Sequence, residues 1–389
     1  MVEKIGALIT GGDFQALGVI RTLARKDIPV VLLDNDLCIG KFSKFKKRFF
    51  KSPSPINEKP YLDFLINLAE EKHLSGWVVF PNNDISVHLL SKNKKILEKY
   101  YKIPTPSWDI IQYVHIKKKF YQLAKKNGIS IPETYYPDNL IELKEMKFEF
   151  PMVIKPSITD NFYQKIKMKA ILIKNMDELI KTYKWVCSII KPSEVLVQEF
   201  IPGGPSRLYS FCPFFKNGTV ISSITARRPR QHPMDFGHAS TFAELVDIPE
   251  IQEISKKFLN LINYYGIAEV EFMKDPRDGK YKLIEINPRI WGWHSLAIAA
   301  GIDLPYMLYQ DMLGQKIKAN KPKKDIKWVR LTTDIPTVLS EVLKRNIKIS
   351  DYITSMKGNK EFAVFSFEDP LPFFMEIALV PYLWWKRGF

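Results

Sequence analysis

Residues 265–292 read YGIAEVEFMKDPRDGKYKLIEINPRIWG, and this stretch decides the fold. Apolar and polar residues alternate over 268–273, which predicts a β-strand with one buried face. The sequence DPRDG at 275–279 is typical of a turn. The apolar run at 281–286 predicts a returning strand, so the whole stretch is expected to form a β-hairpin.

Oxygen-bearing side chains lie at the ends of the two predicted strands. Glu269 and Glu271 share one face of the first strand, because side chains alternate along it, and Glu285 and Asn287 close the second. Carboxylate and amide oxygens are ligands that Mg2+ prefers, with water and substrate phosphates completing its shell. A hairpin with solvated charges is the simpler interpretation, but it does not need Asn, Pro and Arg in a row at a strand end. The stretch therefore predicts a metal–phosphate site.

The order E-x(13)-E-I-N-P-R after an apolar strand resembles the metal-binding end of the ATP-grasp superfamily. The resemblance implies that Mg2+, or Mn2+ in its place, lies between the phosphates of ATP. Its ligands are then Glu271, Glu285 and Asn287, with Glu269 as the second choice for the first ligand. By the same resemblance, Arg289 faces a reacting acyl phosphate.

A basic helix before the sequence GISIPET resembles the segment that carries the family's first phosphate-contacting lysine. Counting back from Gly128 assigns this role to Lys117. The family usually has an acidic residue at the preceding position, where this chain has Ile116, so Lys118 stays open as the alternative. A lysine-rich solvated helix face is the competing interpretation.

Two more lysines match the family's nucleotide contacts. Lys155 lies near the end of the apolar strand FPMVIKP, where a buried charge needs a partner such as phosphate. Lys169 follows a loop at 157–168 that contains no glycine, although the family's lid loop is usually glycine-rich. The resemblance implies that both lysines contact the phosphates of ATP.

The strand EVLVQEFI at 194–201 matches the family segment that links two lobes and lies along the adenine. The resemblance assigns this contact to Gln198, Glu199, Phe200 and Ile201, through backbone groups above all.

Three of four residues at 227–230 are arginines, in the sequence RRPR. Arginine recognises carboxylate and phosphate with two parallel hydrogen bonds. We predict that Arg227 and Arg230 contact the substrate or the γ-phosphate; salt bridges to neighbouring loops are the alternative.

The N-terminal part predicts a βαβ unit, with apolar strands at 4–10 and 29–33 around a helix that GGDFQALG opens. These glycines do not match G-x-G-x-x-G, so they do not favour NAD binding. The expected fold class is α/β, an N-terminal Rossmann-like (pre-ATP-grasp) domain followed by an α+β two-lobed ATP-grasp domain. The expected bounds are 1–105 for the first domain, 106–315 for the second with its lid at about 125–196, and 316–389 for a C-terminal appendage.

The net charge of +16 permits binding to a polyanion, and such a protein is one rival interpretation. The lysines are spread along the chain, so no nucleic-acid partner is expected. Three cysteines without a C-x-x-C pair are typical of a reducing cytosol, which predicts a cytoplasmic protein.

The C-terminal stretch at 371–385 is almost wholly apolar, with Glu376 as its only charge. As a helix it would span roughly 22 Å at 1.5 Å per residue, short of a bilayer core of about 30 Å. Two interpretations follow. The tail docks on the catalytic domain or a second subunit, or it makes peripheral contact with the inner membrane face through WWKR at 384–387.

The resemblance is closest to carboxylate–amine ligases near D-aspartate ligase. It implies an ATP-dependent, ADP-forming ligase with small-molecule carboxylate and amine substrates and an acyl-phosphate intermediate. The alternatives are a non-catalytic ATP-binding module and another ATP-grasp reaction, such as carboxylation or phosphorylation. A homodimer stays open.

Overall fold

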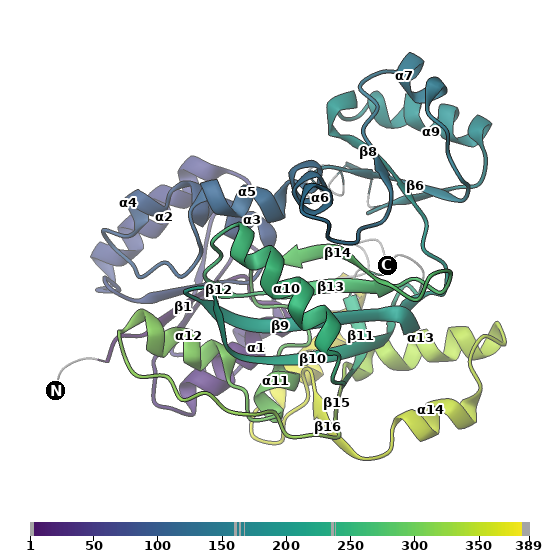
Figure 1. Cartoon of the computed structure of the whole chain (residues 1–389). Coiled ribbons are helices and arrows are strands. Elements are labelled where there is room, and N and C mark those ends of the chain that lie inside the picture. The colour runs from purple at the N-terminus through teal and green to yellow at the C-terminus, as the bar shows by residue number, and fades with distance from the viewer. Residues whose placement is uncertain are drawn as a thin grey trace.

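The computed structural model describes residues 4–158, 162, 165–166, 168–234, 237 and 239–382. Among these residues the strands form three sheets, two of four strands and one of eight (Figure 1). The predicted α/β class is confirmed by this mixture of a parallel sheet, antiparallel sheets and helices. The predicted domain bounds stay a prediction.

The N-terminal sheet is parallel, with the strand order β3–β2–β1–β4. Its strands are β1 (Ala7–Thr10), β2 (Val30–Asp34), β3 (Arg48–Lys51) and β4 (Val78–Pro81). Its helices are α1 (Phe14–Ala24), α2 (Glu58–Glu71), α3 (Asp84–Lys92) and α4 (Lys94–Leu97), with a 3-10 turn η1 (Ile39–Phe42). Ala7 and Ile9 of β1 pack in the core that includes α1, and Leu8 packs in the core that includes α2. Both faces are therefore covered, which explains the continuous apolar runs of β1 and β4.

A second sheet is antiparallel, has the order β5–β8–β6–β7, and stands apart from the rest of the molecule with α7 and α9 (Figure 1). We call it the lid sheet. Its elements are β5 (Thr134–Tyr135), α7 (Leu140–Glu145), β6 (Met152–Pro156), β7 (Ile171–Ile173), α9 (Met176–Cys187), η2 (Pro192–Glu194) and β8 (Val195–Glu199). Helices α5 (Trp108–His115) and α6 (Lys117–Lys126) connect it to the N-terminal part.

The eight-stranded sheet has the order β14–β13–β9–β10–β11–β15–β16, with β12 paired beside β9. Its strands are β9 (Leu208–Lys216), β10 (Thr219–His232), β11 (Ala239–Leu245), β12 (Gly266–Ile267), β13 (Glu269–Lys274), β14 (Tyr281–Asn287), β15 (Ile326–Val329) and β16 (Asn359–Phe362). Associated helices are η3 (Pro205–Arg207), α10 (Pro249–Leu261), α11 (Ser295–Ala299) and α12 (Leu304–Met312).

The predicted hairpin is confirmed by the antiparallel pair β13 and β14. Gly279 has a φ of 73° and donates its backbone N–H to the carbonyl of Asp275 at 2.8 Å, so the turn uses a conformation that favours glycine. Glu271 pairs with Glu285 and Glu269 pairs with Asn287 across the strands. The hairpin therefore brings the predicted metal ligands opposite one another.

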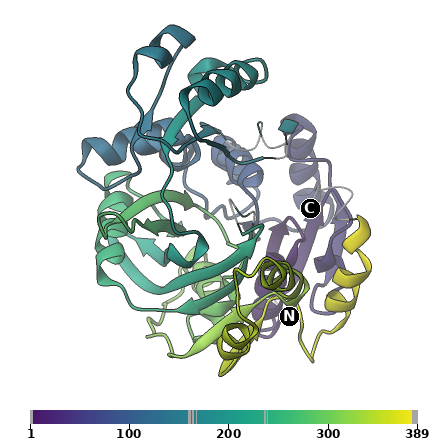
Figure 2. The ribbon, with the colours of Figure 1, turned by 90° about the vertical axis from the view of Figure 1, so that its right-hand side faces the viewer.

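The C-terminal part adds strands β15 and β16 to the eight-stranded sheet and contributes α13 (Leu331–Leu343), α14 (Ile349–Ser355) and α15 (Leu371–Ala378). Helix α15, at the yellow end of the colour scale, lies beside the N-terminal sheet (Figure 2). Buried ion pairs hold this region, from Arg21 to Asp369 at 3.0 Å and from Arg330 to Glu376 at 2.7 Å.

The apolar tail is docked over the part that the structure describes. Phe373, Met375 and Leu379 pack on the core that includes α1, whereas Phe374 on the other side of α15 is 59% exposed. The predicted membrane-contact residues 384–387 lie outside the described residues. Within the described chain, no helix combines the length and the hydropathy needed to cross a bilayer.

Candidate active site

A cavity of about 540 Å³ lies where the lid sheet, the β13–β14 hairpin and the edge of the N-terminal sheet meet. We call it the large cavity. Among the described residues, its charged lining consists of five basic and five acidic side chains, namely Lys117, Lys155, Lys169, Arg228, Arg289, Asp84, Glu199, Glu269, Glu271 and Glu285. Such a mixture suits a ligand that carries both phosphate and a divalent cation.

The hairpin supplies the cavity with oxygen donors. The amide nitrogen of Asn287 donates to Glu271 at 2.8 Å and to Glu269 at 3.1 Å, so these three side chains form one connected group. Glu269 also accepts hydrogen bonds from Ser210 at 3.1 Å and from the indole of Trp293 at 3.0 Å. Glu269 is therefore held from several sides in the wall behind Glu271.

Burial and the neighbouring carboxylate of Glu271 raise the pKa of Glu269 to about 8. Burial alone would also raise the pKa of Glu285, but the ammonium of Lys117 at 2.7 Å holds that pKa below its usual range. The environment thus favours a charged Glu285 and a neutral Glu269. A charged carboxylate is the better metal ligand, which favours Glu285 over Glu269.

Lys117 and Arg228 lie opposite the two carboxylates. The Lys117 ammonium is 2.7 Å from Glu285, and the Arg228 guanidinium donates to Glu271 at 2.6 Å. Lys118, the alternative to Lys117, lies instead near Asp138 at 3.8 Å and is not among the lining residues.

The remaining predicted lysines also line the large cavity. Lys155 is half-buried on β6, and its ammonium lies 3.4 Å from the hydroxyl of Tyr121. Lys169 is exposed, and the carboxylates of Glu285 and Glu271 lie near enough to act on its charge.

The arginine prediction needs a correction. Arg227 pairs with Glu244, and Arg230 pairs with the buried Asp334 at 2.8 Å, so neither lines the large cavity. The salt-bridge alternative describes both. Strand pairing shifts register between Arg227 and Arg230, so simple alternation along β10 does not carry through this segment.

Arg228, which sequence reasoning did not single out, is the arginine of this run that reaches the cavity. It is 6% exposed, and its Nε has no acceptor among the described residues. A buried donor without a partner is costly, so this atom fits an anionic ligand oxygen. The sequence contained only one indication of this difference. Side chains alternate along a strand, so the three arginines cannot all lie on one face.

The four predicted adenine contacts, Gln198, Glu199, Phe200 and Ile201, all line the large cavity. The Glu199 carboxylate accepts hydrogen bonds from Lys282 at 2.5 Å and from Arg277 at 2.8 Å. The amide nitrogen of Gln198 donates to Thr134 at 2.7 Å. Both side chains are thus used within the protein, which leaves backbone groups for a base in this place.

Arg289 joins the hairpin to the N-terminal part. Its guanidinium makes two hydrogen bonds to Asp84, at 2.8 and 2.9 Å. Asp84 begins α3, separated from the end of β4 by two residues, and lines the same cavity. The sequence did not indicate this ion pair, because Asp84 is a single carboxylate at the start of a helix.

The donor set fits a hard cation bound with phosphates, because it consists of carboxylate and amide oxygens next to basic side chains. No cluster of three or more histidine, cysteine or carboxylate side chains that would hold a metal alone occurs in the described chain. The predicted set has two carboxylates and one amide, and it leaves room for ligand oxygens.

A family model described as "ATP-grasp in the biosynthetic pathway with Ter operon" matches residues 193–334. D-aspartate ligase of Enterococcus faecium is 22% identical over 329 residues, which cover 81% of this chain and 78% of that protein.

Solved structures show the same fold. The biotin carboxylase domain of Hydrogenobacter thermophilus 2-oxoglutarate carboxylase, solved with MgADP and bicarbonate, has a TM-score of 0.66 at 17% identity and covers 84% of this chain and 74% of its own. L-amino acid ligase from Bacillus licheniformis has a TM-score of 0.63 at 15% identity, and the match covers 83% of this chain and 76% of that ligase. The chain therefore carries an ATP-grasp domain and is a distant homologue of D-aspartate ligase.

Proposed function

We propose that the protein is an ADP-forming ligase that joins a carboxylate to an amine, with ATP and Mg2+. One observation carries this proposal. The large cavity gathers the oxygens of Glu271, Glu285 and Asn287 beside basic side chains from the lid sheet, the hairpin and β10. A solvated hairpin would not need cations gathered from three separate elements.

In this proposal Glu271, Glu285 and Asn287 hold Mg2+, with Mn2+ as a substitute. The cation neutralises phosphate charge when bound. Lys155 and Lys169 bind phosphate oxygens from the lid side, and Lys117 and Arg228 do so from the opposite wall. Before ligands bind, Lys117 neutralises Glu285 and Arg228 neutralises Glu271. Binding of Mg-ATP exchanges each internal pair for a contact with the ligand, so little charge is left buried without a partner.

The reaction then has two balanced steps. A carboxylate oxygen of the first substrate bonds to the γ-phosphorus, and the bond to ADP breaks. The amine nitrogen next bonds to the acyl carbon, inorganic phosphate leaves, and the nitrogen loses a proton. Arg289 orients the acyl phosphate, while the lid sheet excludes water that would hydrolyse it. The nucleophiles belong to the substrates, so no nucleophilic side chain is required.

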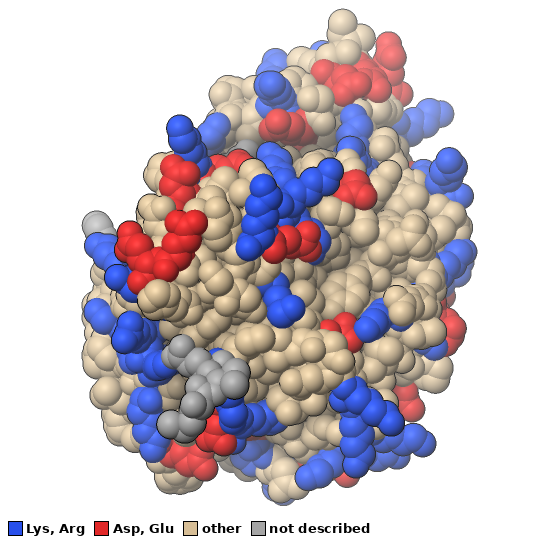
Figure 3. All heavy atoms as spheres, turned by 90° about the vertical axis from the view of Figure 1, so that its left-hand side faces the viewer, with Lys and Arg blue, Asp and Glu red and all other residues tan. Residues whose placement is uncertain are grey.

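Carboxylation is the second candidate, because biotin carboxylase domains are among the structural neighbours. Bicarbonate would then take the place of the organic carboxylate. A polyanion-binding protein is less well supported. On the face seen in Figure 3, basic side chains are interspersed with acidic ones and do not form one continuous stripe. The cytoplasmic location stays a prediction.

The test is ADP release from the full-length protein with Mg2+ and a panel of acid and amine pairs. The proposal expects release that requires one acid and one amine together, and a product whose mass equals their sum minus water. Bicarbonate alone replacing the acid would indicate carboxylation. ATP binding without turnover in any pair would favour the non-catalytic module and contradict the ligase.

A further inference from the structure

Helix α13 carries polar residues on its buried side and apolar residues on its exposed side. Its buried residues are Asp334, Thr337, Val338 and Glu341. Three of these four are polar. On the other side Ile335, Leu339 and Leu343 recur at every fourth position and are 45%, 59% and 85% exposed. A surface helix normally buries its apolar stripe and exposes its polar one, so the outer face of α13 suits an apolar partner.

Helix α14 repeats this exposure. Ile349 and Ile353 lie one turn apart on it and are 61% and 57% exposed. We call residues 331–355, which comprise α13, α14 and the turn between them, the helical pair. Both helices lie at the right-hand edge of the molecule in Figure 1. The helical pair therefore presents five large apolar side chains at one edge of the protein.

Arg230 of β10 holds both helices from the inside. Its guanidinium donates to the carboxylate of Asp334 on α13 at 2.8 and 2.9 Å, and to the hydroxyl of Ser355 on α14 at 2.9 Å. It also lies 5.2 Å from the ring centroid of Tyr352 on α14. The helices are thus anchored through these contacts, and their exposed apolar residues take no part in them.

The turn between the two helices is basic. Its exposed charged residues are Lys344, Arg345 and Lys348. The exposed carboxylate of the helical pair is that of Asp351, since Asp334 and Glu341 are buried. Lys344 donates to Glu341 at 2.8 Å. Cations beside exposed apolar side chains are typical of a helix that lies on an anionic membrane surface.

The charge of the turn distinguishes between two partners that can cover this surface, a second copy of the chain and a lipid bilayer. A two-fold dimer through the helical pair brings the same basic turn from each copy to one interface, and like charges there oppose association. Anionic headgroups complement the turn instead, and the lipid chains below them accept the apolar side chains. The net charge of +16 adds attraction to such a surface.

We propose that the helical pair binds the surface of an anionic lipid bilayer, with the apolar residues of both helices among the lipid chains and with Arg345 and Lys348 at the headgroups. The contact is peripheral and lies in the plane of the interface. It is separate from the contact predicted for residues 384–387, which lie outside the described residues. Lipid binding of this kind does not depend on the proposed ligase activity.

The test is sedimentation of the full-length protein with vesicles of phosphatidylcholine, with and without phosphatidylglycerol. We expect the protein to sediment with the vesicles that contain phosphatidylglycerol and to remain in the supernatant with the others. Added salt should weaken the binding, because it screens the attraction between the basic turn and the headgroups.

Two variants locate the contact. Leu339→Ser combined with Leu343→Ser should lower vesicle binding at least about tenfold, because two apolar side chains are lost from the interface. Ile141→Ser on α7 of the lid sheet, at a position that is 73% exposed, is the matched control and should bind like the wild type. Arg345→Gln should weaken binding about fivefold. All four positions are exposed, so each variant should keep the wild-type Tm.

Three results would overturn the proposal. The first is a wild-type protein that sediments with neither kind of vesicle. The second is vesicle binding that the double serine variant leaves unchanged and that is lost only when residues 383–389 are removed, which would assign the contact to the tail. The third is a dimer, detected by light scattering, that the double serine variant converts to a monomer while no vesicle binding occurs. That result would assign the surface to a second copy of the chain.

Discussion

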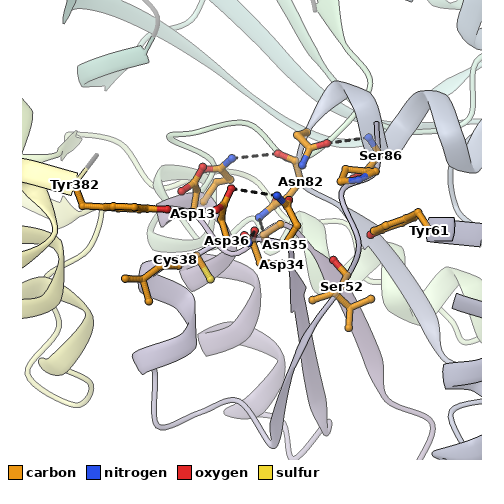
Figure 4. A pocket seen from close by; sticks show the side chains of 16 residues that line it. Asp13, Asp34, Asn35, Asp36, Cys38, Ser52, Tyr61, Asn82, Ser86 and Tyr382 are labelled. Carbon is orange, nitrogen blue, oxygen red and sulfur yellow. Dashed lines mark hydrogen bonds between the residues drawn. The ribbon is translucent and has the colours of Figure 1, made fainter. Parts of the chain in front are cut away.

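The large cavity shares three lining residues with the small cavity, a space of about 220 Å³ at the carboxyl ends of β1, β2 and β4 (Figure 4), yet the charges of their described lining residues differ. The described lining of the large cavity has equal numbers of basic and acidic side chains, whereas that of the small cavity has aspartates and no lysine or arginine. The large one draws its cations from α6, the lid sheet, β10 and the end of β14. The small one is built from loops that follow parallel strands. The two cavities therefore differ in the charge of their described lining residues, although they share one wall.

The largest effect is expected at Glu285, a proposed metal ligand in the large cavity. Glu285→Gln keeps the size of the side chain but removes its charge. We expect turnover to fall on the order of 10³-fold, because the phosphate charge then lacks its counter-ion. ADP release measures this. Glu244→Gln, which alters the partner of Arg227 outside the cavity, is the control. Normal turnover in Glu285→Gln would remove the metal assignment.

The next largest effect is expected on ATP affinity, from two neighbouring arginines of which one lines the large cavity and the other does not. Arg228→Met removes a cation from the large cavity, and Arg227→Met removes one that lies outside it. A hydrogen bond to a charged group contributes about 1.5–3 kcal/mol, so ATP affinity should fall about 10- to 100-fold in the first variant. Titration calorimetry with Mg-ATP measures the dissociation constants. Equal losses in both variants would mean that Arg228 has no special role.

A smaller effect is expected at Lys155 on the lid sheet. Lys155→Met should weaken ATP binding about tenfold, because an ammonium near phosphate acts as a point charge without a fixed pair of hydrogen bonds. Lys144→Met, in the exposed helix α7 of the same sheet, is the matched control. The same calorimetric measurement applies, and an unchanged affinity in Lys155→Met would contradict the contact.

The smallest effect concerns stability and pH. The pKa of Glu269 is about 8 in the folded protein, above its ordinary value of 4.5. Its contribution is therefore fully present below about pH 4.5 and is lost as the pH rises through about 8. Glu269→Gln stays neutral, so its Tm relative to wild type should rise between pH 5 and pH 8, by about 2–4 °C for each kcal/mol of stability that ionisation of Glu269 removes from the wild type. Thermal unfolding at both pH values checks this, and a difference that does not change with pH would contradict it.

The sequence predicts the hairpin well, because alternation and turn chemistry act over a few residues, whereas the metal ligands on it stay a prediction. Lys117 and Lys155, which the sequence analysis singled out beside apolar elements, both line the large cavity, and their contact with phosphate stays a prediction. The sequence was not sufficient to place Arg227 and Arg230. A register shift in β10 decides which arginine faces the cavity, and it depends on how β11 pairs with this strand.

The small cavity could not be predicted in the same way. Its aspartates and Asn82 belong to three loops, and only the parallel pairing of β1 with β2 and β4 brings these loops together. The orientation of single side chains in these loops is also beyond what the sequence alone shows.

Strands β15 and β16 extend the eight-stranded sheet at β11, although they come from the last part of the chain. A ribosome delivers the chain from its N-terminus, so β11 emerges well before its partner β15. During that interval β11 is an uncovered sheet edge, and such an edge is a template for pairing with other chains. The uncovered edge of β11 is therefore an aggregation hazard during translation, and slow translation between β11 and β15 would lengthen that exposure.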